Sequence, residues 1–220
     1  MVDLLLLEKQ FILAHLGEGD TAVDFTMGNG HDTEFLCRTV GPHGHVYAFD
    51  IQEGALTSTR ATLTAAGIAP ENYTLICASH HRVREFVPGP IKAGMFNLGY
   101  LPGSGNKGLT TLRETTMPAV EAAIDLLAPD GILLIAVYPG HEEGRLEGEM
   151  LAAYFATLSR YRLCASLFRI LNSPTSPYFY IVEKKEARPS ENADSAQKGG
   201  TRVSRKADVP SPAPASEPTA

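Results

Sequence analysis

Strand-like and helix-like segments alternate along most of this chain, and that alternation is the strongest constraint on its fold. Short runs of β-branched and aromatic residues predict strands, and longer segments with apolar residues at helical spacing predict helices. When strands alternate with helices of about ten residues or more, each helix crosses over between two parallel strands. The pattern therefore predicts an α/β domain built on a mostly parallel sheet.

The end of the pattern differs, because its last two strands have no helix between them. The predicted strands are 22–26, 45–50, 73–78, 92–98, 132–137, 162–171 and 178–183, and the predicted helices are 4–16, 31–40, 53–66, 82–86, 110–127 and 142–159. The connection 172–177 is too short for a parallel crossover, so the final pair must be an antiparallel hairpin.

This element order resembles that of the class I methyltransferases. Their Rossmann-like fold is α/β, with helices on both faces of a seven-stranded, mostly parallel sheet that ends in an antiparallel hairpin. We expect residues 1–186 to form this domain. Residues 187–220 are rich in Pro, Ser, Ala and charged side chains and poor in large apolar ones, so we predict a disordered tail.

Composition excludes several other classes of protein. The formal net charge of −6 counts against broad, nonspecific binding of nucleic acid, which depends on neutralising phosphates. The three cysteines lack metal-ligand spacing, so no metal is expected; Cys77 and Cys164 lie in apolar runs and are predicted to be core residues. We find no apolar run long enough for a membrane span and no secretory signal, and we expect a cytoplasmic protein.

The first candidate binding segment is D-F-T-M-G-N-G at 24–30, between a predicted strand and a predicted helix. Gly28 and Gly30, on either side of Asn29, allow a tight turn close to a ligand, and the helix opening around Asp32 presents free N–H groups there. The alternative is an ordinary strand-to-helix turn. Thr33 replaces the third glycine of the dinucleotide fingerprint, which disfavours NAD and is compatible with S-adenosylmethionine.

Polar residues also follow the next two strands. Asp50 ends the second strand, where a carboxylate accepts hydrogen bonds from ribose hydroxyls, and Gln52 follows it. The alternative for Asp50 is a surface acid, and its position after an apolar strand favours the ribose role. Ser79 and His80 follow the third strand, where they would contact the adenine; the alternative for Ser79 is an N-cap of helix 82–86.

The fourth and fifth strands end in candidates for the transfer step. The segment N-L-G-Y at 97–100 resembles a degenerate N-P-P-Y motif of amino-directed methyltransferases, which implies that Asn97 accepts hydrogen bonds from a substrate amine and that Tyr100 packs over the acceptor. His141 is a candidate general base or substrate-positioning group, and the alternative is an exposed loop histidine.

Five cations follow or flank the same strand ends and could form a local basic rim for RNA. They are Arg82, Arg84, Lys92, Lys107 and Arg113. The alternative for each of them is ordinary surface charge.

Taken together, the motifs are similar to those of one family, the bacterial and plastid-type tRNA wobble-uridine methyltransferases long labelled rRNA methylases. The motifs are T-M-G-N-G-H-D-T, F-D-I-Q, S-H, N-L-G-Y-L-P-G and Y-P-G-H-E-E-G, and the resemblance spans about residues 1–185. It implies S-adenosylmethionine as cofactor and N-methylation of the 5-aminomethyl group of (2-thio)uridine 34, through contacts with the tRNA anticodon region.

Three other outcomes stay open at this stage. The acceptor could be rRNA or a small-molecule amine, or the chain could be a non-catalytic binding module that kept the fold. The sequence also leaves a homodimer open.

Overall fold

The computed structural model describes residues 4–99 and 111–186, which belong to one compact unit, Met1–Ala187. The predicted tail, 187–220, lies outside the described residues. The strands are β1 (Thr21–Asp24), β2 (His45–Asp50), β3 (Tyr73–Cys77), β4 (Ile91–Leu98), β5 (Leu127–Val137), β6 (Leu163–Phe168) and β7 (Tyr178–Lys184). The helices are α1 (Leu4–Leu13), α2 (His31–Val40), α3 (Glu53–Ala65), α4 (Val83–Phe86), α5 (Arg113–Leu126) and α6 (Glu142–Thr157), with short 3₁₀ turns at Pro70–Asn72 and His80–Arg82.

The strands form one seven-stranded sheet in the order β3-β2-β1-β4-β5-β7-β6. Pairs among β1 to β5 are parallel, and β7 runs antiparallel to both β5 and β6. The strand order reverses between β1 and β4, so a crevice at their carboxyl ends is the expected ligand site of such a sheet. The predicted class I methyltransferase fold is confirmed.

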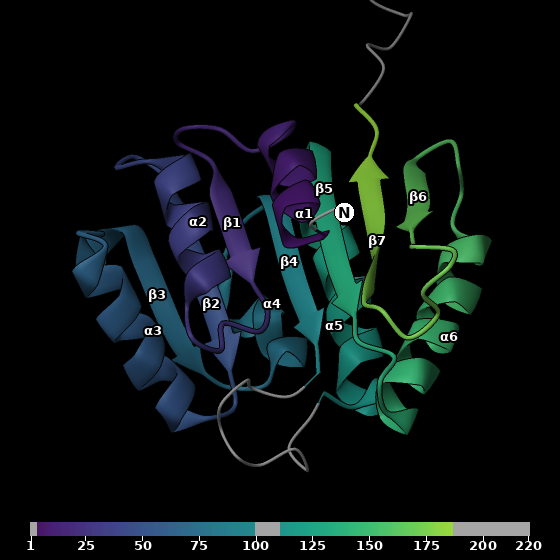
Figure 1. Cartoon of the computed structure of the whole chain (residues 1–220). Coiled ribbons are helices and arrows are strands. Elements are labelled where there is room, and N and C mark those ends of the chain that lie inside the picture. Colours follow the sequence, from purple (N-terminus) through teal and green to yellow (C-terminus); the bar gives the residue numbers. More distant parts are fainter. Residues whose placement is uncertain (1–3, 100–110, 187–220) are drawn as a thin grey trace, which may run out of the picture. The chain divides into compact units, whose positions relative to one another are not determined.

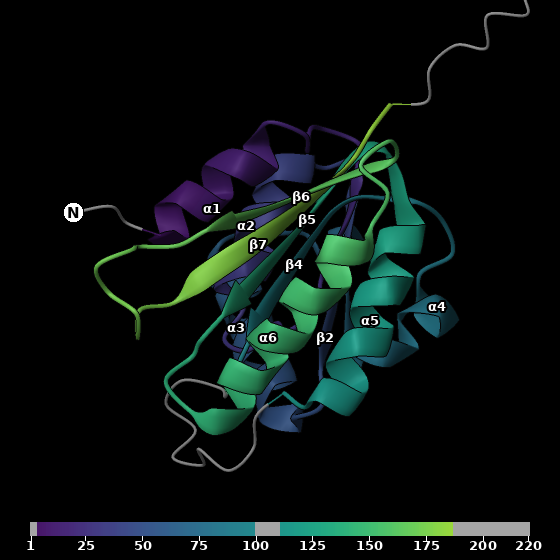
Figure 2. The same ribbon diagram turned by 90° about the vertical axis from the view of Figure 1, so that its right-hand side faces the viewer.

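Two apolar cores lie on opposite faces of the sheet (Figures 1 and 2). Neighbouring residues of β5 alternate between them: Leu133 and Ile135 join the core beneath α4, α5 and α6, while Ile132 and Leu134 join the core beneath α1, α2 and α3. This alternation follows from the two-residue period of a strand, and it explains why residues 132–137 of β5 are all apolar.

The prediction that Cys77 and Cys164 are core residues is wrong, because both side chains are exposed. The buried cysteine is Cys37 on α2. Cys77 ends β3 and Cys164 lies in β6, and these strands are the two edges of the sheet. An edge strand is paired along one side only, so apolar sequence there does not guarantee burial.

Within residues 4–99 and 111–186, no helix combines the length and the apolar character that a membrane crossing requires.

Candidate active site

The parallel pairing brings most of the predicted site residues to one end of the sheet. Asp24 is in register with Ala48 of β2 and Met95 of β4, so the segments after these strands leave the sheet side by side (Figure 1). The glycine turn follows β1, Asp50 ends β2, and Asn97 lies near the end of β4.

The glycine turn is fastened directly to Asp50. The Gly28 N–H donates to Asp50 Oδ2 at 3.2 Å, and the Gln52 N–H donates to Asp50 Oδ1 at 3.0 Å. Burial is the main influence on this carboxyl and raises its pKa, against the opposing effect of these backbone hydrogen bonds. Each carboxylate oxygen has a further lone pair, so Asp50 can still accept bonds from a pair of ribose hydroxyls.

Hydroxyl groups of α3 hold the same turn from its other side. Thr59 Oγ1 donates to the Gly28 carbonyl at 3.1 Å, and Thr62 Oγ1 donates to the Asn29 carbonyl at 2.9 Å. Ser58 Oγ donates to Asn29 Oδ1 at 3.0 Å. The sequence analysis did not identify these three residues. Ser58 and Thr59 lie four and three residues before Thr62, so all three lie on one face of α3, and this spacing was the available signal.

A buried acid lies beneath the turn. Asp24 accepts from Thr33 Oγ1 at 2.6 Å and from the Thr26 N–H at 3.0 Å. Burial, followed by the nearby charge of Asp32, raises the pKa of Asp24 to about 7. The side chains of this acid and Thr33 therefore join the end of β1 to the first turn of α2.

Asn97 is the centre of a second hydrogen-bond network. Its backbone N–H donates to Thr26 Oγ1 at 2.7 Å, and its side-chain Nδ2 donates to Asp32 Oδ2 at 2.7 Å. Tyr138, following β5, donates its hydroxyl to Asn97 Oδ1 at 3.4 Å. Tyr100, predicted to pack over the acceptor, lies outside the described residues.

Ser79 and His80 differ in their surroundings. Ser79 Oγ contacts His81 Nδ1 at 2.8 Å and does not cap the turn that it begins, so its predicted capping alternative is wrong for the side chain. His80 is buried, and its ring packs edge to face on Phe96. Contact of either residue with a cofactor stays a prediction.

The buried ring of His80 predicts a pH effect on stability. Its Nδ1 donates to the Phe25 carbonyl at 3.3 Å, and its Nε2 has no hydrogen-bond partner among the described residues. Burial lowers the pKa of His80 from 6.5 to about 4, so between these values the unfolded chain binds a proton that the folded chain does not. This contribution to the free energy of unfolding is complete above pH 6.5 and is lost as the pH falls toward 4, by up to about 3 kcal/mol.

Denaturant unfolding of a His80→Phe variant between pH 4 and 7 measures this effect. We expect its loss of stability on acidification to be smaller than that of the natural chain. His81→Phe, at the exposed neighbouring position, is the matched control and should keep the natural slope. Equal slopes for the natural chain and His80→Phe would contradict the assignment.

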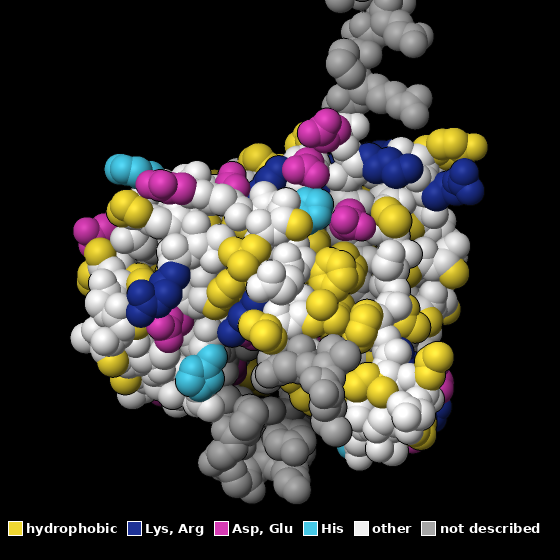
Figure 3. Space-filling view, turned by 45° about the horizontal axis from the view of Figure 1, so that its top comes forward, with side chains coloured by type: hydrophobic (Ala, Val, Ile, Leu, Met, Phe, Trp, Pro, Cys, Tyr) yellow, Lys and Arg dark blue, Asp and Glu magenta, His cyan; other side chains and the backbone are white. Residues whose placement is uncertain are grey.

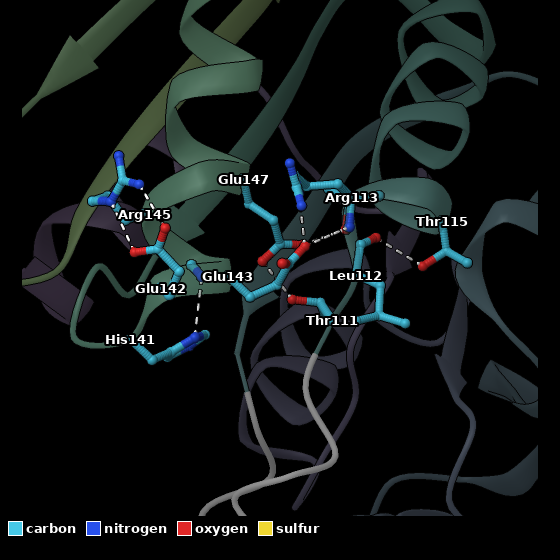
Figure 4. Close-up of polar contacts among 11 residues, drawn as sticks. Thr111, Leu112, Arg113, Thr115, His141, Glu142, Glu143, Arg145 and Glu147 are labelled. Carbon is cyan, nitrogen blue, oxygen red and sulfur yellow. Dashed lines mark hydrogen bonds and ion pairs between the residues drawn. The ribbon is translucent and has the colours of Figure 1, made fainter.

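His141 begins α6 and caps it. Its Nδ1 accepts from the Gly144 N–H at 3.0 Å, so the neutral ring carries its proton on Nε2 (Figure 4). Since Nδ1 accepts this bond and Nε2 carries the proton, neither ring nitrogen is placed to abstract a proton. Of the two predicted roles, the geometry therefore favours positioning of a substrate over proton abstraction.

Beside His141, carboxylates of α6 hold the segment that leads into α5 (Figure 4). Glu147 is fully buried and accepts from Thr111 Oγ1 at 2.8 Å and Thr116 Oγ1 at 2.6 Å. Glu143 pairs with Arg113 at 2.9 Å. These contacts join the start of α5 and the residues just before it to α6.

The predicted basic rim is largely neutralised by neighbouring acids. Four of its members form ion pairs: Arg82 with Glu85, Arg84 with Asp125, Lys92 with Asp130, and Arg113 with Glu143. Lys107 lies outside the described residues. Figure 3 faces the opposite end of the sheet from these strand ends, and both basic and acidic side chains lie on the face that it shows.

Comparison with known proteins decides the family. A family model described as "Putative rRNA methylase" matches residues 46–184, which include Asp50, Asn97 and His141. The chain belongs to this family. The resemblance inferred from its motifs is therefore confirmed.

Relatives of this rRNA methylase family chain include one curated plant protein and several solved structures. This chain is 39% identical over 178 residues to the chloroplastic tRNA (mnm(5)s(2)U34)-methyltransferase of Arabidopsis thaliana. The alignment covers 77% of this chain and 65% of that relative. A solved structure from Clostridium thermocellum, also described as an rRNA methylase, is 34% identical to this chain and has a TM-score of 0.80. The match covers 84% of this chain and 98% of that one.

A second solved relative carries a ligand. It is a protein from Streptococcus mutans, assigned as a methyltransferase and solved in complex with SAH, and it is 33% identical with a TM-score of 0.75. The match covers 84% of this chain and 99% of that one.

No group of three or more His, Cys, Asp or Glu side chains within residues 4–99 and 111–186 is arranged to hold a metal ion.

Proposed function

We propose that this chain is an S-adenosylmethionine-dependent methyltransferase. Its substrate is the 5-aminomethyl group of (2-thio)uridine 34 in tRNA, and its product is 5-methylaminomethyl-(2-thio)uridine. The observation that carries the proposal is the placement of the Gly28–Asp50 contact and the Asn97 network at one end of the sheet, on either side of the point where strand order reverses. The name of the Arabidopsis relative supports this choice of substrate.

The residues at the end of β1 and β2 suit the proposed cofactor. Gly28 and Gly30 both have positive φ and keep the turn free of side chains, and Asp50 has acceptor capacity left for a ribose. We propose that Gln52, Ser79, His80 and Asn29 complete the cofactor set. When bound, S-adenosylmethionine supplies an electrophilic methyl group on a sulfonium.

The chain's own contribution to transfer is alignment of the acceptor. Asn97 Oδ1 accepts a hydrogen bond from the acceptor amine, which directs the nitrogen lone pair away from the amide and toward the methyl group. We propose that His141 helps to position the acceptor nucleoside from the start of α6. We propose that Tyr100 packs over that nucleoside.

We propose that the protein acts in the cytoplasm on the anticodon region of tRNA. We also propose that residues 1–186 form the methyltransferase domain and that residues 187–220 form a disordered tail. Because the described cations of the rim are paired with acids, recognition of the loop rests on the shape and polar groups of the site more than on phosphate neutralisation. Sedimentation of the full chain distinguishes a monomer from a homodimer.

The direct test is methyl transfer by the purified full chain from labelled S-adenosylmethionine. The acceptors are tRNA that carries 5-aminomethyluridine, rRNA, and a small aminomethyl compound. Nucleoside mass spectrometry should find 5-methylaminomethyluridine in the tRNA alone. Label in rRNA or in the free amine, with none in tRNA, would replace the proposal by the corresponding alternative.

A further inference from the structure

We propose that Asp32 is a positioning residue that sets the orientation of the Asn97 side chain. Sequence analysis grouped Asp32 with the cofactor-binding residues, and this inference gives it a different task. It rests on the proposed function, because Asn97 is there the group that receives the acceptor amine.

The hydrogen bond between the Asn97 and Asp32 side chains has a defined direction. The Asn97 atom that lies 2.7 Å from Asp32 Oδ2 is Nδ2, which can only donate, so the Asp32 oxygen accepts this bond. The short distance fits a charge-assisted bond. Oδ1 of the same amide then points away from Asp32, which leaves it available to a substrate N–H.

Positive electrostatic partners lie around the Asp32 side chain. Lys9 of α1 places its Nζ 3.7 Å from Asp32 Oδ1, and both side chains are largely shielded from solvent. Asp32 also lies in the first turn of α2, where the helix dipole favours a negative charge. Asp32 in turn acts on Asp24, because burial, followed by the nearby charge of Asp32, raises the pKa of Asp24 to about 7.

Tyr138 lies on the other side of the Asn97 amide. Burial, with smaller effects from the carboxylates of Glu8 and Asp32, raises the pKa of Tyr138 to about 12, so its hydroxyl stays protonated. It donates to Asn97 Oδ1 at 3.4 Å. A flipped Asn97 amide would face Asp32 with an oxygen and lose that bond, whereas the Tyr138 hydroxyl can donate or accept, so the Asp32 carboxylate is the group that selects the orientation.

Asp32 therefore acts on the reaction through Asn97. One lone pair of Oδ1 is directed to Tyr138, and the other stays free for the acceptor amine. Without the Asp32 carboxylate, both amide orientations become accessible, and one of them presents an NH₂ group where the amine requires an acceptor.

The test is a double-mutant cycle of Asp32→Asn and Asn97→Ala with tRNA that carries 5-aminomethyluridine. In the natural background, Asp32→Asn should lower kcat by about 10- to 30-fold, with KM for tRNA and Kd for S-adenosylmethionine changed by less than about threefold. In the Asn97→Ala background the same change should lower kcat by less than about twofold, because the side chain that Asp32 orients is absent. Glu34→Gln, which removes a carboxylate from the same turn of α2 where it pairs with Arg38, is the matched control and should keep the natural kcat.

Two kinetic results would overturn the proposal. Equal losses of kcat in both backgrounds would mean that Asp32 does not act through Asn97. A tenfold or larger rise of Kd for S-adenosylmethionine at unchanged kcat would return Asp32 to the cofactor site.

A measurement without turnover separates this proposal from the proposed function. In ¹⁵N-edited NMR spectra of the full chain, the Asn97 side-chain amide should shift in Asp32→Asn and stay in place in Glu34→Gln. An unmoved Asn97 amide in Asp32→Asn would refute the positioning role. Failure of the natural chain to methylate the tRNA would refute the function alone.

Discussion

Asn97→Ala should lower kcat by about 100- to 1000-fold, because the acceptor amine loses the hydrogen-bond acceptor that aligns its lone pair with the methyl group. The backbone N–H of residue 97 still donates to Thr26 Oγ1, and this contact does not depend on the replaced side chain. The fold and Kd for S-adenosylmethionine should therefore change little. Single-turnover kinetics with tRNA, together with calorimetric titration of S-adenosylmethionine, measures both quantities.

The matched control for this change is Gln10→Ala. Gln10 is an exposed amide side chain on α1, so the variant should keep the natural kcat. If Asn97→Ala retained full turnover, the role assigned to this side chain would be wrong, whatever the substrate.

Gly30→Ala should destabilise the fold and weaken cofactor binding together. A Cβ at this position would lie 2.8 Å from Thr59 Cα and 2.9 Å from Thr59 Cγ2, and the residue has a φ of +83°. The left-handed backbone costs about 1 kcal/mol, and the clash with α3 adds roughly 1–3 kcal/mol in the free energy of unfolding. Because the clash moves the turn away from α3, Kd for S-adenosylmethionine should rise at least about tenfold.

Gly19→Ala isolates the conformational part of this effect. Gly19 has nearly the same φ, +85°, and a Cβ there would meet nothing within 4 Å. Its variant should lose only about 1 kcal/mol and keep the natural Kd. Denaturant unfolding and calorimetry of both variants give the comparison, and equal losses would show that the approach of Gly30 to α3 is unimportant.

Much of the fold was predictable because its signals are local. The ends predicted for the second helix and the second strand, 31–40 and 45–50, agree with α2 and β2. The boundaries of α5 and β6 are less accurate: the helix begins at Arg113 rather than 110, and the strand covers Leu163–Phe168 rather than 162–171. Helix and strand ends depend on contacts with other elements, which local periodicity does not contain.

The candidate site was predictable only in part. The positions of the glycine turn, Asp50 and Asn97 followed from strand ends, because parallel strands in one sheet end at the same edge. The roles of Tyr138, Lys9 and the α3 hydroxyls did not follow, because their contacts join residues that are distant in sequence.

The sequence by itself determined the order of strands and helices, the terminal hairpin and the family, since these depend on side-chain period, connection length and motif letters. Only the tertiary structure decided how individual side chains are used: the Asp32–Asn97 bond, the helix cap made by His141 and the pairing of the basic rim with acids. The physical reason is that a hydrogen bond or ion pair requires two groups within about 3 to 4 Å of each other, and that distance is set by how separate elements pack.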